Sequence, residues 1–328
     1  MTQVAGTTDS FDVSSLKESL DSVIWDLFPM DTYFQNNIDK ESVGQPQHQW
    51  VFDTLAAAAN NKQIQGDTFT YATVATATRV SNYTQIARKA ITVSETLIAS
   101  NTVGGNAMGR EVMKKMKEFK RDVEFDLLGR QGSSAGATNS AAASGGVLAW
   151  IWGQGAAIPG NTIAATSSAG TTPSYASSVV AGQTDGTTAA SSITYTDVEN
   201  AAELAWLDGG EPDVILCSNG QKKVVDAFTS RATRTADISD TDKLTIQGSV
   251  NLLVTSFGTF KVVMSRYIPR NCLVLLQMDK WAMGQLRPTK VMEPAQTADA
   301  KNKVIIGEYT LIARNPFSSA KVVDFKES

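Results

Sequence analysis

The sequence NAMGREVMKKMKEFKRDVEFDLL, residues 106–128, lies between Gly105 and Gly129 and has a clear helical pattern. Apolar side chains recur in it at steps of three and four residues, which places them on one face of an α-helix: Met108, Val112, Met116, Phe119, Val123 and Leu127, with Met113, Phe125 and Leu128 widening the stripe. Asn106 can cap the start, and Gly129 suits the left-handed residue that often ends a helix. About 23 residues at roughly 1.5 Å each give a rod of roughly 35 Å. We expect this spine helix to lie along one face of a sheet or domain.

Composition limits the classes of function. The 328 residues are 42% hydrophobic, enough for a sizeable core and one or two domains. A net charge of -4 with a pI of about 5.2 argues against a nucleic-acid-binding surface. No run of apolar residues is long enough to span a membrane, and the N-terminus lacks the pattern of a signal peptide. Cys217 and Cys272 lie in apolar runs without CxxC spacing, which indicates buried thiols in a reducing compartment such as a cytoplasm.

The chain before the spine helix divides into an arm and a β-rich stretch. Residues 1–15 are polar, and residues 16–27 form a short amphipathic helix that Pro29 ends. Asp31 and Thr32 can then cap a second turn that ends at Ile38. From Gln49 to Val93, high β-propensity predicts two long antiparallel strands joined by a loop near Asn60 to Gly66. Because two strands alone are only marginally stable, we expect this β-arm to rest on another subunit.

Residues 131–192 have a different composition. Gly, Ala, Ser and Thr fill 44 of these 62 positions, a bias typical of a flexible, solvated surface segment. The apolar stretch GGVLAWIWG, residues 145–153, interrupts the segment, and we expect Trp150 and Trp152 to anchor it.

The C-terminal half has alternating helix and strand patterns. TDVENAAELAWLDGGEP predicts a helix with Val198, Ala201, Ala202, Ala205 and Trp206 on one face and a stop at Gly209 and Gly210. A buried strand over 213–217 and a helix capped by Ser218 or Asn219 follow. Strands are predicted at 251–255 and 260–264 around a turn at Gly258, within 271–288, and over 304–316. The fold class is therefore α+β.

Several long stretches resemble one family in the correct order. They are the pattern Leu20, Asp21, Val23, Ile24, Pro29, Asp31, Thr32, Phe34 and Ile38; GGEPDVILCSNGQKKVVDAF (209–228); SFGTFKVVMSRYIPRNCLVLLQMDKWAMGQLRP (256–288); and GEYTLIARNP (307–316). With the order arm, β-arm and long helix, they resemble the major capsid proteins of tailed double-stranded DNA bacteriophages, which have the Hong Kong 97-type capsid fold. The resemblance covers most of the chain except residues 131–192.

The resemblance implies a structural protein that self-assembles into hexamers and pentamers of an icosahedral or prolate head enclosing the phage genome. Both arms would lie across neighbouring subunits. The implied division is an N-terminal arm (1–48), an extended β-hairpin loop (49–95), the spine helix of a peripheral domain (96–130), an insertion or surface segment facing outward or inward (131–192), a mainly axial domain (193–265), and a β-rich part returning to the peripheral domain (266–328). Implied partners are a portal, a separate scaffolding or decoration protein, and packaged DNA bound without sequence specificity. Assembly would take place in the host cytoplasm, with no membrane.

The sequence offers little for catalysis. His48 is the only histidine and has polar neighbours, so a hydrogen-bonding role is favoured over a general base. GGNAMG, residues 104–109, precedes a helix but lacks the rest of a phosphate-binding motif, so a hinge and cap are favoured. Asp240 and Asp242 are too sparse for a cation site. We expect no catalytic, cofactor-binding or metal-binding residues, and no enzyme activity.

Charges on the spine helix and in the β-arm have structural interpretations. Five basic residues of the helix (Lys114, Lys115, Lys117, Lys120 and Arg121) alternate with five acidic ones (Glu111, Glu118, Asp122, Glu124 and Asp126). This near-cancellation favours a solvated or inter-subunit face over a nucleic-acid site, and Glu111 precedes Lys115 at the spacing of a helical ion pair. Lys62 lies beside Asn60 and Asn61, but no catalytic glutamate for an isopeptide bond is evident, so covalent linkage is not expected.

Two other classes of function remain open. The Thr/Ser/Gly/Ala-rich segment and the β-rich C-terminal third are also compatible with a phage tail or surface adhesin, although the long helix and the lack of repeats argue against it. A hydrolase using Ser218 or Cys217 is a third, more distant reading.

Overall fold

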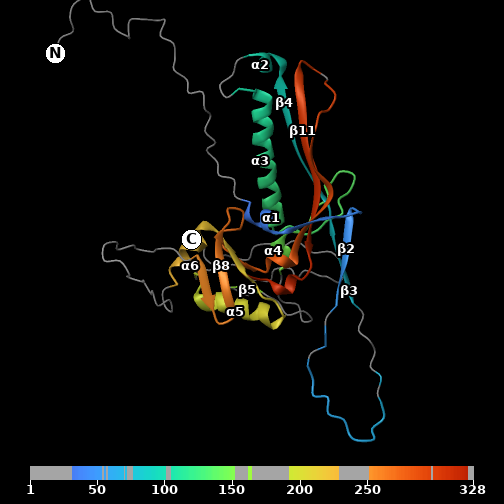
Figure 1. The fold of residues 1–328 in the computed structure, drawn as a ribbon, viewed down its shortest axis with the longest axis vertical. Helices are drawn as coiled ribbons and strands as arrows, with labels where there is room; N and C mark the ends of the chain where they lie inside the picture. Colours follow the sequence, from blue (N-terminus) through green and yellow to red (C-terminus); the bar gives the residue numbers. More distant parts are fainter. Residues whose placement is uncertain are drawn as a thin grey trace, which may run out of the picture.

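The computed structural model describes residues 32–53, 55–56, 58–69, 71, 77–100, 105–151, 192–228, 251–296 and 298–323, and the backbone of 162–164. Figure 1 shows three parts: a tall upper part built on the longest helix, a lower part with a second sheet, and a long loop that leaves the molecule beside the lower part. No helix in these ranges is long and apolar enough to cross a membrane.

The upper part is a four-stranded sheet with the spine helix along it. The helix, α3 (Ala107–Leu127), contacts β4 (Gln85–Ser94) and β11 (Ala300–Ala313). The sheet order is β1-β10-β11-β4, in which β1 (Asp39–Ser42) runs parallel to β10 (Trp281–Met292) and the other pairs are antiparallel. A short helix, α2 (Glu95–Ala99), follows β4. The predicted spine helix and its position on a sheet are confirmed.

The detailed pattern of the spine helix is mostly as predicted. The Asn106 side chain accepts a hydrogen bond from the Gly109 N–H at 3.1 Å, which confirms the cap. Met108, Phe119, Val123 and Leu127 are buried, and Val112 and Met116 are partly buried against the core. Met113 and Phe125 were expected in the stripe but are 67% and 58% exposed, because the sheet covers a narrower sector of the helix than the full apolar pattern.

Two further expectations for this helix are wrong. Gly129 does not adopt a left-handed conformation: the helix ends at Leu128 in right-handed geometry, and the Gln131 side chain donates to the Asp126 carbonyl. A side chain thus supplies a partner for one of the final carbonyls, which the glycine turn usually provides. Lys115 pairs with Glu118 at 2.7 Å rather than with Glu111.

The lower part is a six-stranded sheet with two helices. Its order is β5-β12-β9-β6-β8-β7, with parallel pairs β5–β12 and β6–β8. The strands are β5 (Thr162–Ala164), β6 (Val214–Cys217), β7 (Leu252–Thr255), β8 (Gly258–Met264), β9 (Leu273–Leu276) and β12 (Ala320–Val323). The helices are α5 (Tyr195–Leu207) and α6 (Asn219–Asp226).

The helices and turns predicted for this region are confirmed with one exception. Thr194 and Asp197 form a capping box for α5, and Ser218 caps α6. Gly209 and Gly258 have φ of 77° and 148°, as the stop and the turn require. Trp206 was placed on the buried face of α5, but it is 56% exposed because the small alanines of that helix make the contact with the sheet.

The chain crosses twice between the two sheets. The first crossing runs from β9 through η2 (Met278–Lys280) into β10, and the second from β11 through η3 (Pro316–Ser318) into β12. Residues 266–328 therefore do not all return to the upper part: β9 and β12 pair with β6 and β5 in the lower sheet, which corrects the division expected at residue 266. Strand pairing decides this membership, and local sequence does not carry it.

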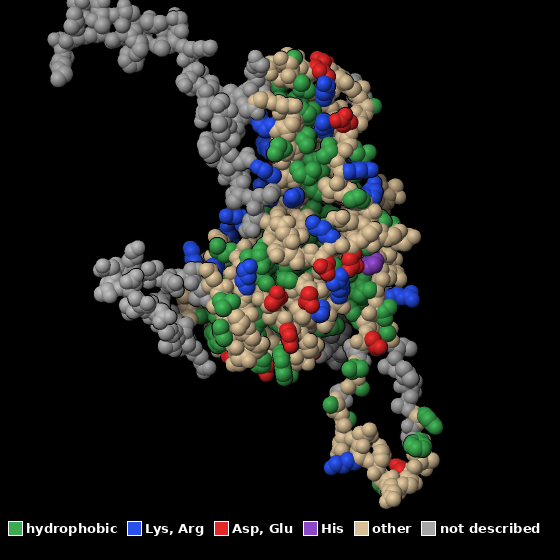
Figure 2. Space-filling model, in the orientation of Figure 1, with side chains coloured by type: hydrophobic (Ala, Val, Ile, Leu, Met, Phe, Trp, Pro, Cys, Tyr) green, Lys and Arg blue, Asp and Glu red, His purple; other side chains and the backbone are tan. Residues whose placement is uncertain are grey.

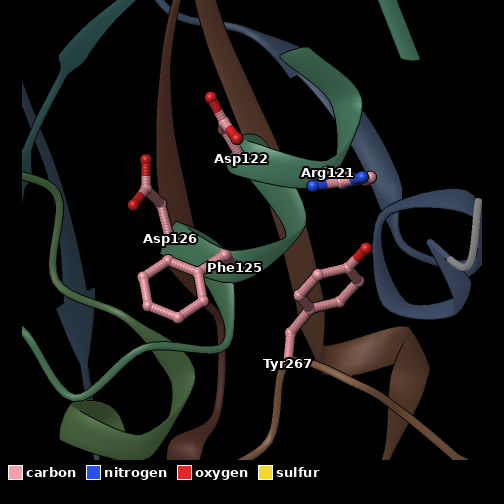
Figure 3. Close-up of a pocket in the computed structure, with 5 residues that line it drawn as sticks. All are labelled: Arg121, Asp122, Phe125, Asp126 and Tyr267. Carbon is pink, nitrogen blue, oxygen red and sulfur yellow. The ribbon is translucent and has the colours of Figure 1, made fainter. Parts of the chain in front are cut away.

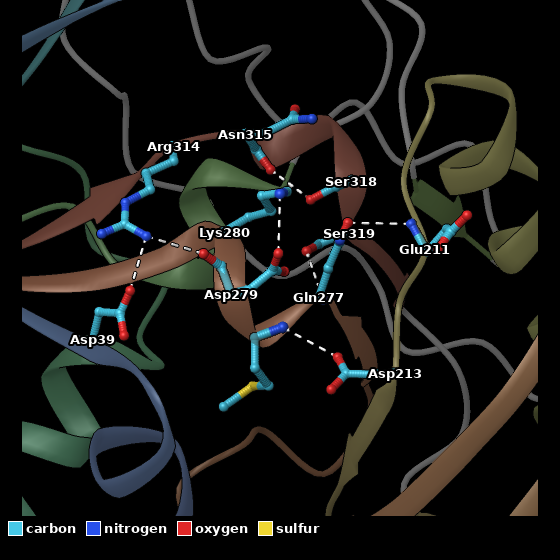
Figure 4. Close-up of polar contacts among 11 residues, drawn as sticks. Asp39, Glu211, Asp213, Gln277, Asp279, Lys280, Arg314, Asn315, Ser318 and Ser319 are labelled. Atoms are coloured by element: carbon cyan, nitrogen blue, oxygen red, sulfur yellow. Dashed lines mark hydrogen bonds and ion pairs between the residues drawn. The ribbon is translucent and has the colours of Figure 1, made fainter.

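Hydrogen bonds fix both crossings, as Figure 4 shows. The Ser319 Oγ accepts from the Trp281 Nε1 at 3.1 Å and from the Gln277 N–H at 3.3 Å. The Asp213 carboxylate accepts from the Met278 N–H at 3.1 Å. One apolar cluster contains side chains from the spine helix together with others from β6 and β9, so the two sheets share a core across the junction.

The first part of the Gly/Ala/Ser/Thr-rich segment is packed, contrary to expectation. Residues 131–151 contain two isolated β-bridges and a short helix, α4 (Val147–Trp150), whose four side chains are buried. Gly146 lies so close to Gly129 that a Cβ would stand 2.2 Å from its carbonyl oxygen, so small residues here serve close backbone contact. Trp150 is the expected anchor. Trp152 and the rest of the segment, apart from the β5 backbone, lie outside the described residues.

The extended loop is narrower at its base than expected. β2 (Gln47–Phe52) pairs antiparallel with β3 (Thr78–Tyr83), with Gln47 opposite Tyr83 and Phe52 opposite Thr78. The described residues between the two strands form no strand, and β4, expected within the hairpin, instead pairs with β11 in the upper sheet. Threonine-rich sequence has β-propensity without supplying a partner strand, and tertiary pairing decided which part became sheet.

Candidate functional site: assembly interfaces

Asn82 is the polar centre of the extended loop's base. This side chain is fully buried on β3, and its Nδ2 donates to the Leu311 carbonyl at 2.7 Å, the Ser144 Oγ at 3.2 Å and the Gly145 carbonyl at 3.3 Å. Its Oδ1 accepts from the Gly145 N–H at 2.8 Å and the Tyr83 N–H at 3.1 Å. One amide therefore joins β3, the packed segment 131–151 and β11. Because buried polar groups are costly to leave unpaired, this arrangement fixes the direction in which the loop leaves.

Aromatic rings fix the same base on its other strand. Trp50 lies with its ring centroid 5.2 Å from that of Trp150, and Phe52 lies 6.0 Å from Phe317 in an edge-to-face contact. Alternate residues of β2 thus face the core, while Val51 between them is 58% exposed. Burial of these rings gives the loop base a stability that two strands lack by themselves.

Beyond this base the loop carries exposed apolar side chains. Leu55 is 99% exposed, Ile64 81%, Phe69 88% and Tyr71 92%. Figure 1 shows the loop extending away from both sheets, and Figure 2 shows hydrophobic side chains along it. Isolated exposed apolar residues are ordinary on a protein surface, but four on one projecting loop mark a binding surface.

A carboxylate on the spine helix anchors the N-terminal region. The short helix α1 (Tyr33–Asn37) confirms the predicted second turn, although the Thr32 side chain does not cap it. Instead the Glu124 carboxylate accepts from the Phe34 N–H and the Gln35 N–H, both at 2.8 Å. Glu124 is fully buried, so its assignment to a solvated face was wrong. A charged acceptor on two free N–H groups of a helix start is a strong cap, supplied here from a distant part of the sequence.

The next element, β1, is held by ion pairs. Arg314 donates to the Asp39 carboxylate at 2.9 Å and also to Glu41, and these bonds raise the pKa of the guanidinium. Arg314 also donates to the Asp279 carbonyl at 3.2 Å, at the first crossing between the sheets (Figure 4). The chain is thus attached from Thr32 to Ser42, and this attachment sets where residues 1–31 begin.

Asp126 forms a third polar centre, beside a surface pocket. Its carboxylate accepts from Gln85 Nε2 at 2.7 Å and from the Tyr309 hydroxyl at 2.9 Å. Burial raises the pKa of Asp126, which the two hydrogen bonds partly oppose, and burial also raises the pKa of Tyr309. Figure 3 shows the pocket, lined by Arg121, Asp122, Phe125, Asp126 and Tyr267, with Phe125 and Tyr267 facing one another across it.

The residues considered for catalysis occupy structural positions. The Ser218 hydroxyl donates to the Arg270 carbonyl at 3.5 Å and accepts from Gln221, so it caps a helix and contacts no base. Cys217 is buried, and burial raises the pKa of its thiol to about 12, which disfavours the nucleophilic thiolate. His48 lies on β2 with its ring 5.7 Å from Trp50, and burial lowers its pKa while the charge of Glu41 opposes that change.

The remaining candidates do not come together either. Gly105 has φ of 78° before the spine helix, in agreement with a hinge, and Gly104 lies outside the described residues, as do Asp240 and Asp242. Asn60, Asn61 and Lys62 are exposed in the extended loop, and the absence of a covalent link there stays a prediction. The described residues contain no group of three or more His, Cys, Asp or Glu side chains that could hold a metal.

Sequence reasoning missed the residues that hold these interfaces in place. Asn82 and Ser144 are ordinary polar residues of a β-rich and a small-residue stretch, and no spacing marks them. Glu124 carried one signal: it lies between Val123 and Phe125, close to the apolar stripe, where a solvated charge is unexpected.

The comparisons with known proteins agree with this architecture. Residues 3–326 match the model of a family described as SU10 major capsid protein. The major capsid protein of Escherichia phage Phieco32 is 26% identical over 338 residues, covering 94% of both chains. Among solved structures, the capsid of cyanophage A-1(L) has a TM-score of 0.69 at 13% identity, covering 94% of this chain and 97% of that one. The capsid of cyanophage P-SCSP1u has a TM-score of 0.61 at 13% identity, covering 99% and 97%.

The fold is also found outside phage heads. The SrpI encapsulin of Synechococcus elongatus PCC 7942 has a TM-score of 0.57 at 8% identity, covering 95% of this chain and 94% of that one. The spine helix along its sheet, the second sheet and the extended loop define the class as the Hong Kong 97-type capsid fold. Within that class, the chain belongs to the SU10 major capsid protein family. It is a structural protein of the phage virion, a subunit of the capsid shell, and the adhesin alternative has no support.

Proposed function

We propose that the chain assembles through hexamers and pentamers into a closed icosahedral or prolate head around the phage genome, with no enzyme activity. The observation that carries this proposal is the contrast within the extended loop. Its base is buried and hydrogen-bonded to the subunit's own core, whereas Leu55, Ile64, Phe69 and Tyr71 beyond it are more than four-fifths exposed. A loop built in this way supplies apolar contact to another subunit.

The two sheets correspond to two roles in such an assembly. The four-stranded sheet and spine helix form the peripheral domain, and the six-stranded sheet with α5 and α6 forms the axial domain near the centre of a capsomer. The support is the topology: the crossings at η2 and η3 join the sheets through a shared core, as a subunit that transmits force around a shell requires. Residues 1–31 and the extended loop are then the parts that reach beyond the domain body.

The extended loop lies across a neighbouring subunit in this proposal. Obligate interfaces bury on the order of 2,000 Å² or more, and a projecting loop adds contact area without enlarging the core. Many modest contacts closed by symmetry give cooperative assembly. The four exposed side chains named above are the ones that would be desolvated.

Further partners follow from the role of a genome container. The net charge of -4 suits a shell that holds double-stranded DNA without sequence-specific binding. We infer a portal and a separate scaffolding or decoration protein as partners, and assembly in the host cytoplasm, where Cys217 and Cys272 stay reduced as free thiols.

Electron microscopy of the protein expressed alone tests the proposal, with a double variant in the loop. We expect closed shells or capsomer rings from the unchanged chain. Phe69→Ser with Tyr71→Ser should give folded subunits that form no closed shell, whereas Thr68→Ser in the same loop should assemble normally. Normal shells from the double variant would refute the role of the loop. If the unchanged chain gives only monomers even with the neighbouring phage genes co-expressed, the assembly proposal fails.

A further inference from the structure

The outer face of the spine helix carries a basic stripe. Arg110, Lys114, Lys117 and Arg121 follow one another at steps of four, three and four residues, which places them on one line along the helix. The first three are exposed and Arg121 is half-buried. Figure 2 shows Lys and Arg side chains along this edge of the upper part.

The acidic residues of the helix do not neutralise this stripe, because other partners use them. Asp122 pairs with Lys89 on β4 at 2.5 Å, and Glu118 pairs with Lys115, which lowers the pKa of Glu118. Glu124 caps α1, and Asp126 binds Gln85 and Tyr309. The charges therefore cancel in composition but separate in space, and the outward line keeps a positive field.

Exposed apolar side chains accompany the stripe. Met113 is 67% exposed beside Lys114, and Phe125 is 58% exposed one turn beyond Arg121. Phe125 forms one wall of the pocket in Figure 3, with Tyr267 opposite and Arg121 pointing toward the blue segment that contains α1. The surface thus offers cationic and apolar contacts together, which fits an acidic amphipathic segment.

The chain contains such a segment in residues 1–31. It has six acidic residues and one basic residue, a net side-chain charge of 1 − 6 = −5: the acids are Asp9, Asp12, Glu18, Asp21, Asp26 and Asp31, and the base is Lys17. Its part from 16 to 27 has the helical apolar pattern of Leu16, Leu20, Val23, Ile24 and Leu27. At helical spacing Asp21 and Asp26 flank that apolar stripe on either side.

The anchoring of α1 brings the two surfaces within reach. Thr32 is 4% exposed, and the N–H groups just after it bind Glu124, one turn from Arg121. The five residues that lead from Leu27 to Thr32 span up to roughly 17 Å. The twelve residues 16–27 are roughly 18 Å long as a helix, and the spine helix from Glu124 back to Arg110 is roughly 21 Å long. The lengths match for a segment that turns back along the helix.

We propose that residues 16–27 bind antiparallel along the outer face of the spine helix of their own chain, with acidic side chains on the Arg110–Arg121 stripe and apolar side chains against Met113 and Phe125. Exposed ion pairs are individually weak, but the short tether gives an effective concentration of about a millimolar, so weak contacts suffice. This inference rests on the proposed role of residues 1–31 as an assembly element. It implies that residues 1–15 alone extend toward a neighbour.

Zero-length carbodiimide crosslinking tests the contact, because it joins a lysine amine to a carboxylate only when they touch. We expect mass spectrometry of the full chain to find Lys114 joined to Glu18 or Asp21. The triple variant Arg110→Glu, Lys114→Glu, Arg121→Glu should lose protection of residues 16–27 from limited proteolysis. Adding Glu18→Lys, Asp21→Lys and Asp26→Lys should restore it with the charges exchanged. The matched control Lys290→Glu, an exposed reversal on β10, should leave both signals unchanged.

Mixing ordinary and ¹⁵N-labelled chains identifies which chain supplies the segment. Crosslinked peptides of one isotope only support the proposal, whereas mixed peptides overturn it in favour of a neighbour's arm. The proposal also fails if the triple variant changes the retention of duplex DNA while leaving crosslinks to residues 16–27 intact in Lys114-containing controls. The readout applies equally to soluble subunits and shells, so failure to assemble is distinguishable from failure of this contact.

Discussion

The extended loop has two ends with opposite character. At its base, Asn82, Trp50 and Phe52 are joined to a core that also contains Trp150, and no charge intervenes between them. Twenty residues along, Tyr71 is 92% exposed. The base obtains its stability inside the subunit. The tip has apolar surface that no described part of its own chain covers.

This difference teaches how one segment serves a subunit that must be stable alone and adhesive in an assembly. A rigid base fixes direction, so that a loop of many residues reaches a defined place on a neighbour. An exposed tip keeps its free energy of burial for assembly. Substitutions should therefore divide into those that unfold the subunit and those that stop the shell, and the following predictions test that division.

Trp150→Ala should have the largest effect on the subunit. The side chain is fully buried on α4 and contacts Trp50, so its loss leaves a cavity that costs about 3–5 kcal/mol of unfolding free energy. Chemical denaturation measures the change. Trp206→Ala is the matched control: that side chain is 56% exposed, and its loss should cost less than about 1 kcal/mol. Equal losses from the two variants would contradict the assignment of Trp150 to the core.

Asn82→Ala should have the next largest effect. It leaves the Gly145 N–H and the Leu311 carbonyl without their partner in a buried site, at about 1–3 kcal/mol for each group left unsatisfied. Asn61→Ala, in the exposed part of the same loop, should change the unfolding free energy by less than about 0.5 kcal/mol. Hydrogen exchange at the β2–β3 backbone should rise in the Asn82 variant alone. Unchanged protection there would mean that the amide does not hold the base.

Asp126→Asn should change a pH dependence more than a stability. Burial raises the folded pKa of Asp126 above its ordinary 3.8, so the folded subunit binds more protons than the unfolded chain between those two values. Its contribution to stability is therefore present below pH 3.8 and is lost as pH rises through the folded pKa. The variant cannot titrate, and its unfolding free energy should fall less over that interval. A parallel pH profile for both proteins would refute the raised pKa.

The loop variant Phe69→Ser with Tyr71→Ser should have the smallest effect on the isolated subunit. Both side chains are nearly fully exposed, so replacement should change the unfolding free energy by less than about 0.5 kcal/mol. The same variant should abolish closed shells. A loss of subunit stability comparable to that of Asn82→Ala would show that the tip folds back on its own subunit, and the comparison between base and tip would no longer hold.

The sequence by itself determined the elements with a strong local signal. The spine helix, the capped helices α5 and α6, the turns at Gly209 and Gly258 and the buried strand β6 follow from periodicity and capping residues that act within a few positions. The order of these elements and the extended matches to one family also indicated the capsid fold. No structural contact was needed for either conclusion.

Only the tertiary structure decided which surfaces are covered and which are free. Met113, Phe125 and Trp206 belong to apolar patterns yet are exposed, while Glu124 belongs to a charged pattern yet is buried as the cap of α1. The packing of residues 131–151, the pairing of β4 with β11 and the return of β12 to the lower sheet are equally invisible in local sequence. The reason is physical: burial and strand pairing depend on partners tens to hundreds of residues away, whereas propensity and periodicity report only on neighbours along the chain.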